Sequence, residues 1–247
     1  MKILTFNVRN RYGIKNYNGM YKGINTINNL SDYVKSNDID IIALQEVVES
    51  YRDNLTNALN TYYVYGKPRL GSNIFTRKID KLKRFNESAN IYTKEEALKC
   101  MCYKLPNLPD LLPRVATLVE YKLDNKEITI INVHLSAYNK ISKNRQLKYL
   151  YKKIKHIKTP IILLGDFNMN IKSNIMNKFI DKLSNLGINH LEIKGRTFKK
   201  SKRNLPIDHV FISNSLKVNN IEKVKDEIVS FSDHYPVLID FRGNNNE

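Results

Sequence analysis

Short apolar runs in this sequence end repeatedly in acids, histidines or carboxamides. The clearest run is residues 161–164, which stands behind Pro160 and leads into the sequence GDFN, with Asp166 and Asn168. An unbroken apolar run of this length is typical of a strand buried on both faces. Because an unpaired charge is too costly inside such a strand, we expect Asp166 where the strand emerges, beside a glycine that permits a bend or a close approach.

The same pattern occurs at five more places along the chain. Taken alone, each of these residues is more often a turn residue, a helix cap or a satisfied histidine. Taken together they predict one site, because functional residues gather at strand ends that a rigid sheet holds in place. The full set is Asn7, Glu46, His134, Asp166 with Asn168, Asp208, and Asp233 with His234.

These residue types suit the hydrolysis of a phosphate ester, whose negative charge repels an attacking hydroxide. A hard divalent cation neutralises that charge, and Mg²⁺ prefers one or two protein carboxylates. Glu46 is the best candidate ligand, with Asn7 and Asp233 as helpers. The histidines can grip phosphoryl oxygens or protonate the leaving oxygen, and Asp166 can orient or deprotonate the attacking water.

Strands and helices alternate along the whole length, which favours a single domain over residues 1–247 with a frayed tail at about 242–247. Residues 78–113 contain three prolines and are expected to form a loop that acts as a lid or binding segment. The expected strands are 2–8, 41–44, 62–65, 73–76, 115–123, 127–135, 161–164, 207–213 and 235–241. The expected helices are 20–36, one behind Ser50, 147–157 and 175–186.

The composition indicates an anionic partner. Lys and Arg number 41 against 24 Asp and Glu, which gives a formal net charge of +17. Nucleic acid is the favoured partner, DNA before RNA, and an anionic membrane surface is the alternative. A generically basic surface would explain the charge without any partner. Clustered cations in the loop 195–204 are expected to bind substrate: Lys199, Lys200, Lys202 and Arg203.

Cysteine usage and hydropathy predict the cellular context. Cys100 and Cys102 are too few for a disulfide framework or a four-ligand zinc site. The first residues are too polar for a signal-peptide core, and no apolar run reaches membrane-spanning length. We therefore expect a cytoplasmic monomer without a transmembrane segment.

Six motifs, in this order, resemble the endonuclease/exonuclease/phosphatase superfamily. They are TFNVR (5–9), ALQEV (43–47), NVHLS (132–136), GDFN (165–168), IDHVFIS (207–213) and SDHYPV (232–237). Each motif alone is weak, but the ordered set spans nearly the whole chain and is specific. The resemblance implies an α/β fold like that of DNase I, a four-layer α/β/β/α sandwich of two packed mixed β-sheets flanked by helices. It also implies metal-dependent hydrolysis of a phosphodiester or phosphomonoester.

The resemblance further implies a metal site. Glu46 looks like the family's principal Mg²⁺ ligand, assisted by Asn7, and Asp233 lies next to the metal; Mn²⁺ or Ca²⁺ are alternative ions. Abasic-site nucleases of the family have an aspartate two residues after the asparagine, whereas this chain has Arg9. Arg9 is closer to DNase I, and we assign it to substrate binding.

Catalytic roles also follow from the resemblance. His134 and His234 look like the histidines that grip the phosphate, and Asp208 resembles the acid that pairs with His234. Asp166 looks like the acid that positions or activates the water, and Asn168 like the residue that holds the scissile phosphate. DNase I-like members support the first histidine with a glutamate from the preceding hairpin, but residues 62–77 here contain no acid.

Three functions are therefore considered. The first is a Mg²⁺-dependent nuclease that hydrolyses phosphodiester bonds of DNA, or of RNA. The second is a lipid or inositol phosphate hydrolase with the same site, in which residues 105–113 could touch a membrane. The third is a non-catalytic basic binding module, which the intact set of acids and histidines disfavours.

Overall fold

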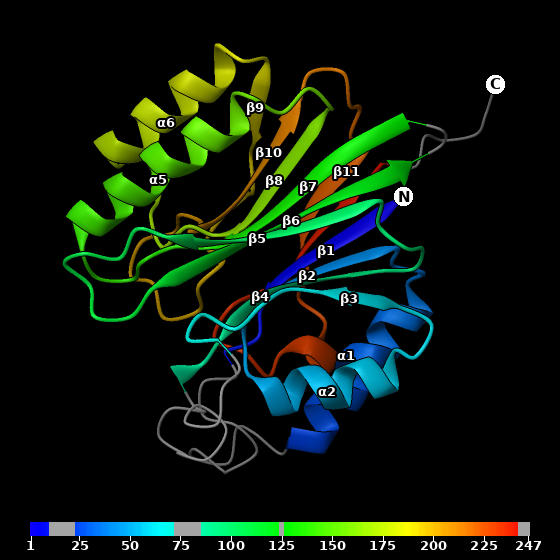
Figure 1. The fold of residues 1–247 in the computed structure, drawn as a ribbon. Coiled ribbons are helices and arrows are strands. Elements are labelled where there is room, and N and C mark those ends of the chain that lie inside the picture. The colour runs from blue at the N-terminus through cyan, green and yellow to red at the C-terminus, as the bar shows by residue number, and fades with distance from the viewer. Residues whose placement is uncertain (10–22, 72–84, 124–125, 242–247) are drawn as a thin grey trace.

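Two six-stranded sheets pack face to face and helices cover both outer faces, so the molecule has four layers (Figure 1). This computed structural model describes residues 1–9, 23–71, 85–123 and 126–241 of the chain. The expected α/β/β/α sandwich of two mixed sheets is confirmed.

The first sheet is built around the parallel pair β1 and β2, and its other neighbours are antiparallel. In spatial order it contains β11 (Asn220–Lys223), β12 (Val237–Asp240), β1 (Lys2–Asn7), β2 (Ile41–Val47), β4 (Ser88–Thr93) and β3 (Tyr63–Tyr65). Its outer face packs against α1 (Gly23–Ser36), α2 (Glu49–Ala58) and the short 3-10 helix η2 (Glu227–Val229). Leu4, Leu44 and Leu30 are fully buried in this outer core.

The second sheet repeats the arrangement around the parallel pair β7 and β8. In spatial order it contains β5 (Lys99–Leu105), β6 (Arg114–Leu123), β7 (Lys126–His134), β8 (Ile161–Asp166), β10 (Asp208–Ser213) and β9 (Ile188–Leu191). Its outer face is covered by α5 (Lys140–Ile154) and α6 (Asn174–Ser184). The Asn139 side chain caps α5 by accepting from the amides of Ile141 and Ser142.

The space between the sheets is filled by apolar side chains from both, among them Ile3, Ile41, Ile130 and Ile162. One face of β8 packs in the core between the two sheets, and the other face packs against the helices. This burial on both faces explains its unbroken apolar run. Near one end of the sandwich, Asn132 ties the sheets together. Its Nδ2 donates to the carbonyls of Leu44 and Asn90, both at 2.9 Å.

The prediction for residues 78–113 was wrong, because this segment contains β4 and β5. The three prolines that suggested a loop, Pro106, Pro109 and Pro113, all fall between β5 and β6. β3 pairs with β4, whereas residues 73–76, which we expected to pair with it, lie outside the described residues. The helix expected at 147–157 begins earlier, at Lys140, and the expected tail at 242–247 is likewise outside the described residues.

The cysteines and the helices bear on the expected cellular context. Cys100 and Cys102 lie on β5 as free thiols. None of the helices in the described ranges has the length and apolar character needed to cross a membrane.

Candidate active site

The two parallel strand pairs end at the same place in the sandwich. In the first sheet Asn7 closes β1 next to β2, and in the second sheet His134 and Asp166 lie side by side at the ends of β7 and β8. The Asn7 Nδ2 donates across the gap between the sheets to Asp166 Oδ2 at 2.9 Å. Carboxyl ends of parallel strands are the usual position of a site in α/β proteins.

A β-bulge in β2 directs Glu46 into this region. The register with β4 shifts between Leu44 and Val47, and Glu46 has a φ of 58° in the left-handed region. Its Oε1 lies 3.3 Å from Asn7 Nδ2 and 3.7 Å from His134 Nε2. A bulge re-aims a side chain at some cost in backbone strain, which is a common feature of functional sites.

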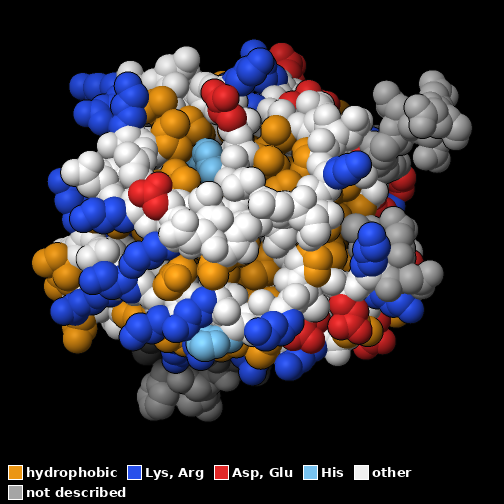
Figure 2. Space-filling model, turned by 90° about the horizontal axis from the view of Figure 1, so that it is seen from above, with side chains coloured by type: hydrophobic (Ala, Val, Ile, Leu, Met, Phe, Trp, Pro, Cys, Tyr) orange, Lys and Arg blue, Asp and Glu red, His pale blue; other side chains and the backbone are white. Residues whose placement is uncertain are grey.

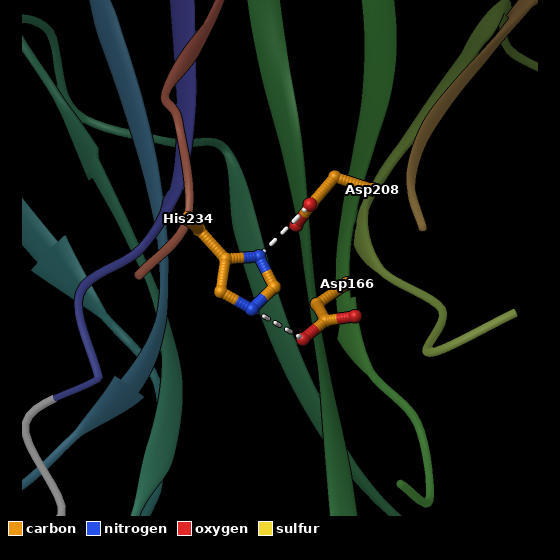
Figure 3. A group of neighbouring side chains, drawn as sticks. All are labelled: Asp166, Asp208 and His234. Atoms are coloured by element: carbon orange, nitrogen blue, oxygen red, sulfur yellow. Dashed lines mark hydrogen bonds and ion pairs between the residues drawn. The ribbon is translucent and has the colours of Figure 1, made fainter. Parts of the chain in front are cut away.

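His234 lies between two aspartates that come from neighbouring strands of the second sheet (Figure 3). Its Nδ1 is 2.9 Å from Asp208 Oδ2, and its Nε2 is 3.8 Å from Asp166 Oδ2. Burial alone would lower the pKa of His234, but Asp208 and Asp166 outweigh it and raise that pKa to about 10. Burial and the charge of Asp208 raise the pKa of Asp166 to about 7. The imidazole is therefore a buried imidazolium at neutral pH.

His134 has a different environment, which the sequence analysis missed. Arg114 Nη1 lies 3.1 Å from its Nδ1 and 3.3 Å from its Nε2. The guanidinium is also 3.6 Å from Glu87 Oε2, which Arg69 approaches at 3.1 Å. Since an arginine can only donate, His134 must offer it a lone pair. Glu87 stands directly before β4, outside the residues 62–77 in which the resemblance places an acid, and no local pattern marks it as a partner of Arg114.

Asn168 is held by hydrogen bonds from its own backbone and from its side chain. Its φ is 52°, its amide donates to Asp166 Oδ1 at 2.8 Å, and its Nδ2 donates to the Leu135 carbonyl at 3.0 Å. The buried Lys143 donates from Nζ to the Asn168 carbonyl at 2.8 Å, and burial lowers the pKa of this lysine. Lys143 was also missed, because it lies in the first turn of α5, ahead of the predicted helix.

Asp233 and Arg9 form an ion pair of 2.6 Å at the edge of the site. Arg9 has a φ of 49°, and its amide donates to Asn7 Oδ1 at 2.9 Å. The Ser232 hydroxyl donates to the Asn7 carbonyl at 2.6 Å and accepts from the His234 amide at 3.1 Å. The structure thus brings Asp233 beside the site, with its carboxylate directed at Arg9.

The cations of the basic loop, residues 195–204, differ in their surroundings. The Lys199 Nζ donates to the carbonyls of Ser230 and Ser232 at 2.7 and 2.6 Å, so this side chain fastens the segment that carries His234. Lys200, Lys202 and Arg203 are exposed.

The donor set fits a hard divalent cation. The carboxylates of Glu46 and Asp166 each approach His134 Nε2 to 3.7 Å, and the Asn7 side chain touches both. These are oxygen-rich groups of the kind that Mg²⁺ prefers. Ligand atoms of Asp166, Asp208 and His234 also lie within 4.8 Å of one another, but Asp208 and His234 are already bonded to each other. Glu46, with Asn7 and Asp166 beside it, therefore suits a cation better.

The model of the Endonuclease/Exonuclease/phosphatase family matches residues 4–234. This chain belongs to that family. Members of the family are hydrolases that act on phosphoester bonds and generally use a divalent metal. The ordered motifs had predicted this membership, and it is confirmed.

Several solved structures share the fold. A mannosyl-6-phosphatase of Bacteroides thetaiotaomicron is 21% identical, with a TM-score of 0.79 over 98% of this chain and 100% of that one. The human nocturnin catalytic domain with bound sulfate is 17% identical, with a TM-score of 0.74 over 98% of this chain and 93% of that one.

Among sequence relatives, a UPF0294 protein of Vibrio cholerae is 26% identical over 64% of this chain. The chain spans little more than half of that relative, 56% of its length.

Proposed function

We propose that this chain is a divalent-metal-dependent phosphodiester hydrolase and that its substrate is nucleic acid, DNA in preference to RNA. The observation that carries the proposal is the convergence of strand ends from both sheets. Asn7 contacts Asp166 at 2.9 Å across the sandwich, and Glu46 approaches His134 at 3.7 Å. Burying acids and histidines this close together costs stability, and such clusters are concentrated at functional sites.

Glu46 and Asn7 would hold the cation, Mg²⁺ by our proposal, with Asp166 facing the same point. When bound, the ion would neutralise charge on the phosphoryl group. Asp166, with a pKa near 7, can accept the proton of the attacking water as the water oxygen bonds to phosphorus. His234, which carries a proton between two aspartates, can give it to the leaving oxygen. His134 would bind a phosphoryl oxygen, oriented by Arg114.

Surface charge supports nucleic acid as the substrate. The chain has a net charge of +17, and Lys and Arg side chains crowd one side of the face that Figure 2 shows. Exposed lysines on α5 and α6 contribute, including Lys148, Lys152 and Lys178. Neutralisation of backbone phosphates supplies most of non-specific affinity for nucleic acid.

A lipid or inositol phosphate hydrolase is the second candidate. The observation that favours it is the exposure of aliphatic side chains next to the site, with Leu108 66% and Leu111 95% exposed. A phosphomonoester is a further substrate class to test, because one structural neighbour is named a mannosyl-6-phosphatase.

The test measures acid-soluble nucleotides released from plasmid DNA in Mg²⁺ and in EDTA. Sphingomyelin vesicles, phosphoinositide vesicles and mannose 6-phosphate are assayed in parallel. We expect release from DNA only with Mg²⁺, its loss in His234→Ala, and unchanged release in His156→Ala, a change at an exposed histidine. Cleavage of a lipid or of mannose 6-phosphate with inert DNA would overturn the proposed substrate.

A further inference from the structure

Four large hydrophobic side chains are exposed in two segments that adjoin the site. Two lie between β5 and β6, one lies just before the N-cap of α5, and one lies in the first turn of α5. We call this set the apolar rim: Leu108 (66% exposed), Leu111 (95%), Tyr138 (83%) and Ile141 (57%). Exposed hydrophobic residues that gather in one place usually mark an interaction surface.

The two segments form one surface, because α5 holds the loop through its backbone. Ser142 Oγ donates to the Asn107 carbonyl at 3.1 Å, Arg145 Nη1 to that of Leu108 at 3.0 Å, and Gln146 Nε2 to that of Pro106 at 3.0 Å. Ile141 is four residues before Arg145, so both lie on the same face of the helix. The backbone of the rim is thus fixed while its apolar side chains stay in solvent.

The apolar rim is directly connected to the site. The loop that carries Leu108 and Leu111 ends at Arg114, which contacts His134 at 3.1 Å. In the first turn of α5, Lys143 donates to the Asn168 carbonyl at 2.8 Å. Anything that covers the rim therefore lies near the side chains that contact His134 and Asn168.

Exposed cations stand in the same two segments as the apolar rim. Lys104, Lys140 and Arg145 are exposed there, and Asp110 is the one acid within residues 104–114 and 134–146. In Figure 2 hydrophobic side chains protrude among Lys and Arg at the left edge, the side on which Figure 1 places the β5–β6 connection and the start of α5. Apolar side chains that project between cations are typical of proteins that lie on an anionic bilayer.

We infer that the apolar rim is a docking surface for an anionic lipid bilayer. Three of its four members are aliphatic, whereas surfaces that stack on single-stranded nucleic acid use aromatic rings. Docking would bring the part of the site that contains His134 and Asn168 close to the membrane. The inference goes beyond the proposed hydrolysis and holds whether the ester cleaved there belongs to a lipid or to nucleic acid at the bilayer.

The test is co-sedimentation of the full chain with vesicles in EDTA, so that no hydrolysis is measured. Vesicles of phosphatidylcholine alone are compared with vesicles that also contain phosphatidylserine. We expect binding to the anionic vesicles and a fall of at least tenfold in the partition coefficient for the double variant Leu108→Ser, Leu111→Ser. The matched control is Leu98→Ser, a change at a leucine 55% exposed between β4 and β5, which should bind as the wild type does.

Three results would overturn the inference. One is that the wild type does not bind anionic vesicles, and another is that the double variant binds them as well as the wild type. The third is that the double variant loses affinity for a duplex oligonucleotide in fluorescence anisotropy while its vesicle binding is unchanged, which would assign the rim to nucleic acid. Circular dichroism melts of all variants confirm that folding is retained. Since none of these readouts is catalytic, failure of the proposed hydrolysis would not affect them.

Discussion

At the scale of single residues, the two histidines of the site both lie near Asp166 but differ in their nearest polar neighbour. His234 lies between Asp208 and Asp166, which raise its pKa to about 10, whereas His134 faces the guanidinium of Arg114 at 3.1 Å. One histidine is thus a cation that can donate a proton, and the other offers a lone pair to Arg114. This division of roles is what a reaction that protonates one oxygen and binds another needs.

Replacing Asp208 tests that division. In Asp208→Asn the negative charge 2.9 Å from His234 Nδ1 is gone, and burial then disfavours the imidazolium. We expect kcat to fall by about 10²- to 10⁴-fold, the usual contribution of a general acid. The exposed Asp53→Asn is the control and should keep the wild-type kcat. A kcat within threefold of wild type in Asp208→Asn would remove His234 from its proposed role.

The sequence predicts the acids and histidines of the site better than their supports. Asn7, Glu46 and Asp166 could be found because each ends an apolar run. Arg114 and Glu87 could not, because an arginine or glutamate at a strand start is ordinary until its long-range partner is known. Their contact joins β6 to the residue before β4, and no local pattern encodes it.

At the scale of elements, Gly165 decides how closely β8 can approach β7. A Cβ at this position would lie 2.1 Å from the Val133 carbonyl oxygen, and its φ of 129° is rarely adopted by other residues. The sequence analysis expected a bend or a close approach here, and the approach is that of the neighbouring backbone. It allows Asp166 and His134 to end their strands side by side.

Gly165→Ala should therefore destabilise the fold by roughly 2–4 kcal/mol, through the forced shift of a packed strand and the strained backbone. Gly71→Ala is the matched control. Its φ of +78° is also left-handed, but no atom lies within 4 Å of the added Cβ. We expect a cost of only about 1 kcal/mol there. Equal losses in urea denaturation would show that the close approach contributes nothing.

A histidine pair, of which His209 is buried and His190 is half-buried, links β9, β10 and the segment after β8. His209 Nε2 donates to the Met169 carbonyl at 2.7 Å, and its Nδ1 accepts from His190 Nε2 at 2.9 Å. Burial and the neighbouring His190 lower the pKa of His209 from its usual value of about 6.5 to about 4. Both rings are therefore neutral in the folded protein at neutral pH.

This pair predicts how stability depends on pH. Between pH 6.5 and 4, His209 is protonated in the unfolded chain but stays neutral in the folded chain. The free energy of unfolding is therefore highest above pH 6.5 and decreases as the pH falls toward 4. The expected loss is on the order of 3 kcal/mol at pH 4. Urea denaturation from pH 7 to 4 checks it, with His209→Gln expected to flatten the slope and the exposed His156→Gln to leave it unchanged. An unaltered slope in His209→Gln would contradict the assignment.

The sequence predicts the interior strands of both sheets except β4, but of the edge strands it predicts only β3. β2 and β8 contain continuous apolar runs, β1 and β7 have mixed patterns rich in apolar residues, and the prediction of all four was confirmed. β5 is an edge strand with exposed lysines at both ends of its sequence, and nearby prolines concealed it. β9 and β11 have four residues each, too few for a periodic pattern to reveal.

At the scale of the whole molecule, the excess positive charge is the main argument for a nucleic-acid substrate. With a net charge of +17, the chain should attract polyanions before any specific contact forms. The exposed cations of the basic loop, Lys200, Lys202 and Arg203, lie in the segment that precedes Asp208.

Changing Lys200, Lys202 and Arg203 together to Ala should weaken DNA binding and reduce the slope of log K against log salt by about 2–3. Lys199→Ala is expected to act differently, because Nζ of this lysine holds the carbonyls of Ser230 and Ser232. It should lower stability in thermal melts more than it changes the salt slope. A triple variant with the wild-type slope would show that the loop does not contact phosphates.

We propose that strand ends from the two sheets converge into one metal-dependent centre. The most direct test of this proposal is Mn²⁺ binding, followed by electron paramagnetic resonance, together with hydrolysis of bis(p-nitrophenyl) phosphate by the same samples. We predict saturable Mn²⁺ binding to the wild type, at least tenfold weaker binding to Glu46→Gln, and hydrolysis that EDTA abolishes. Wild-type hydrolysis undiminished by EDTA, or Mn²⁺ affinity unchanged in Glu46→Gln, would contradict it.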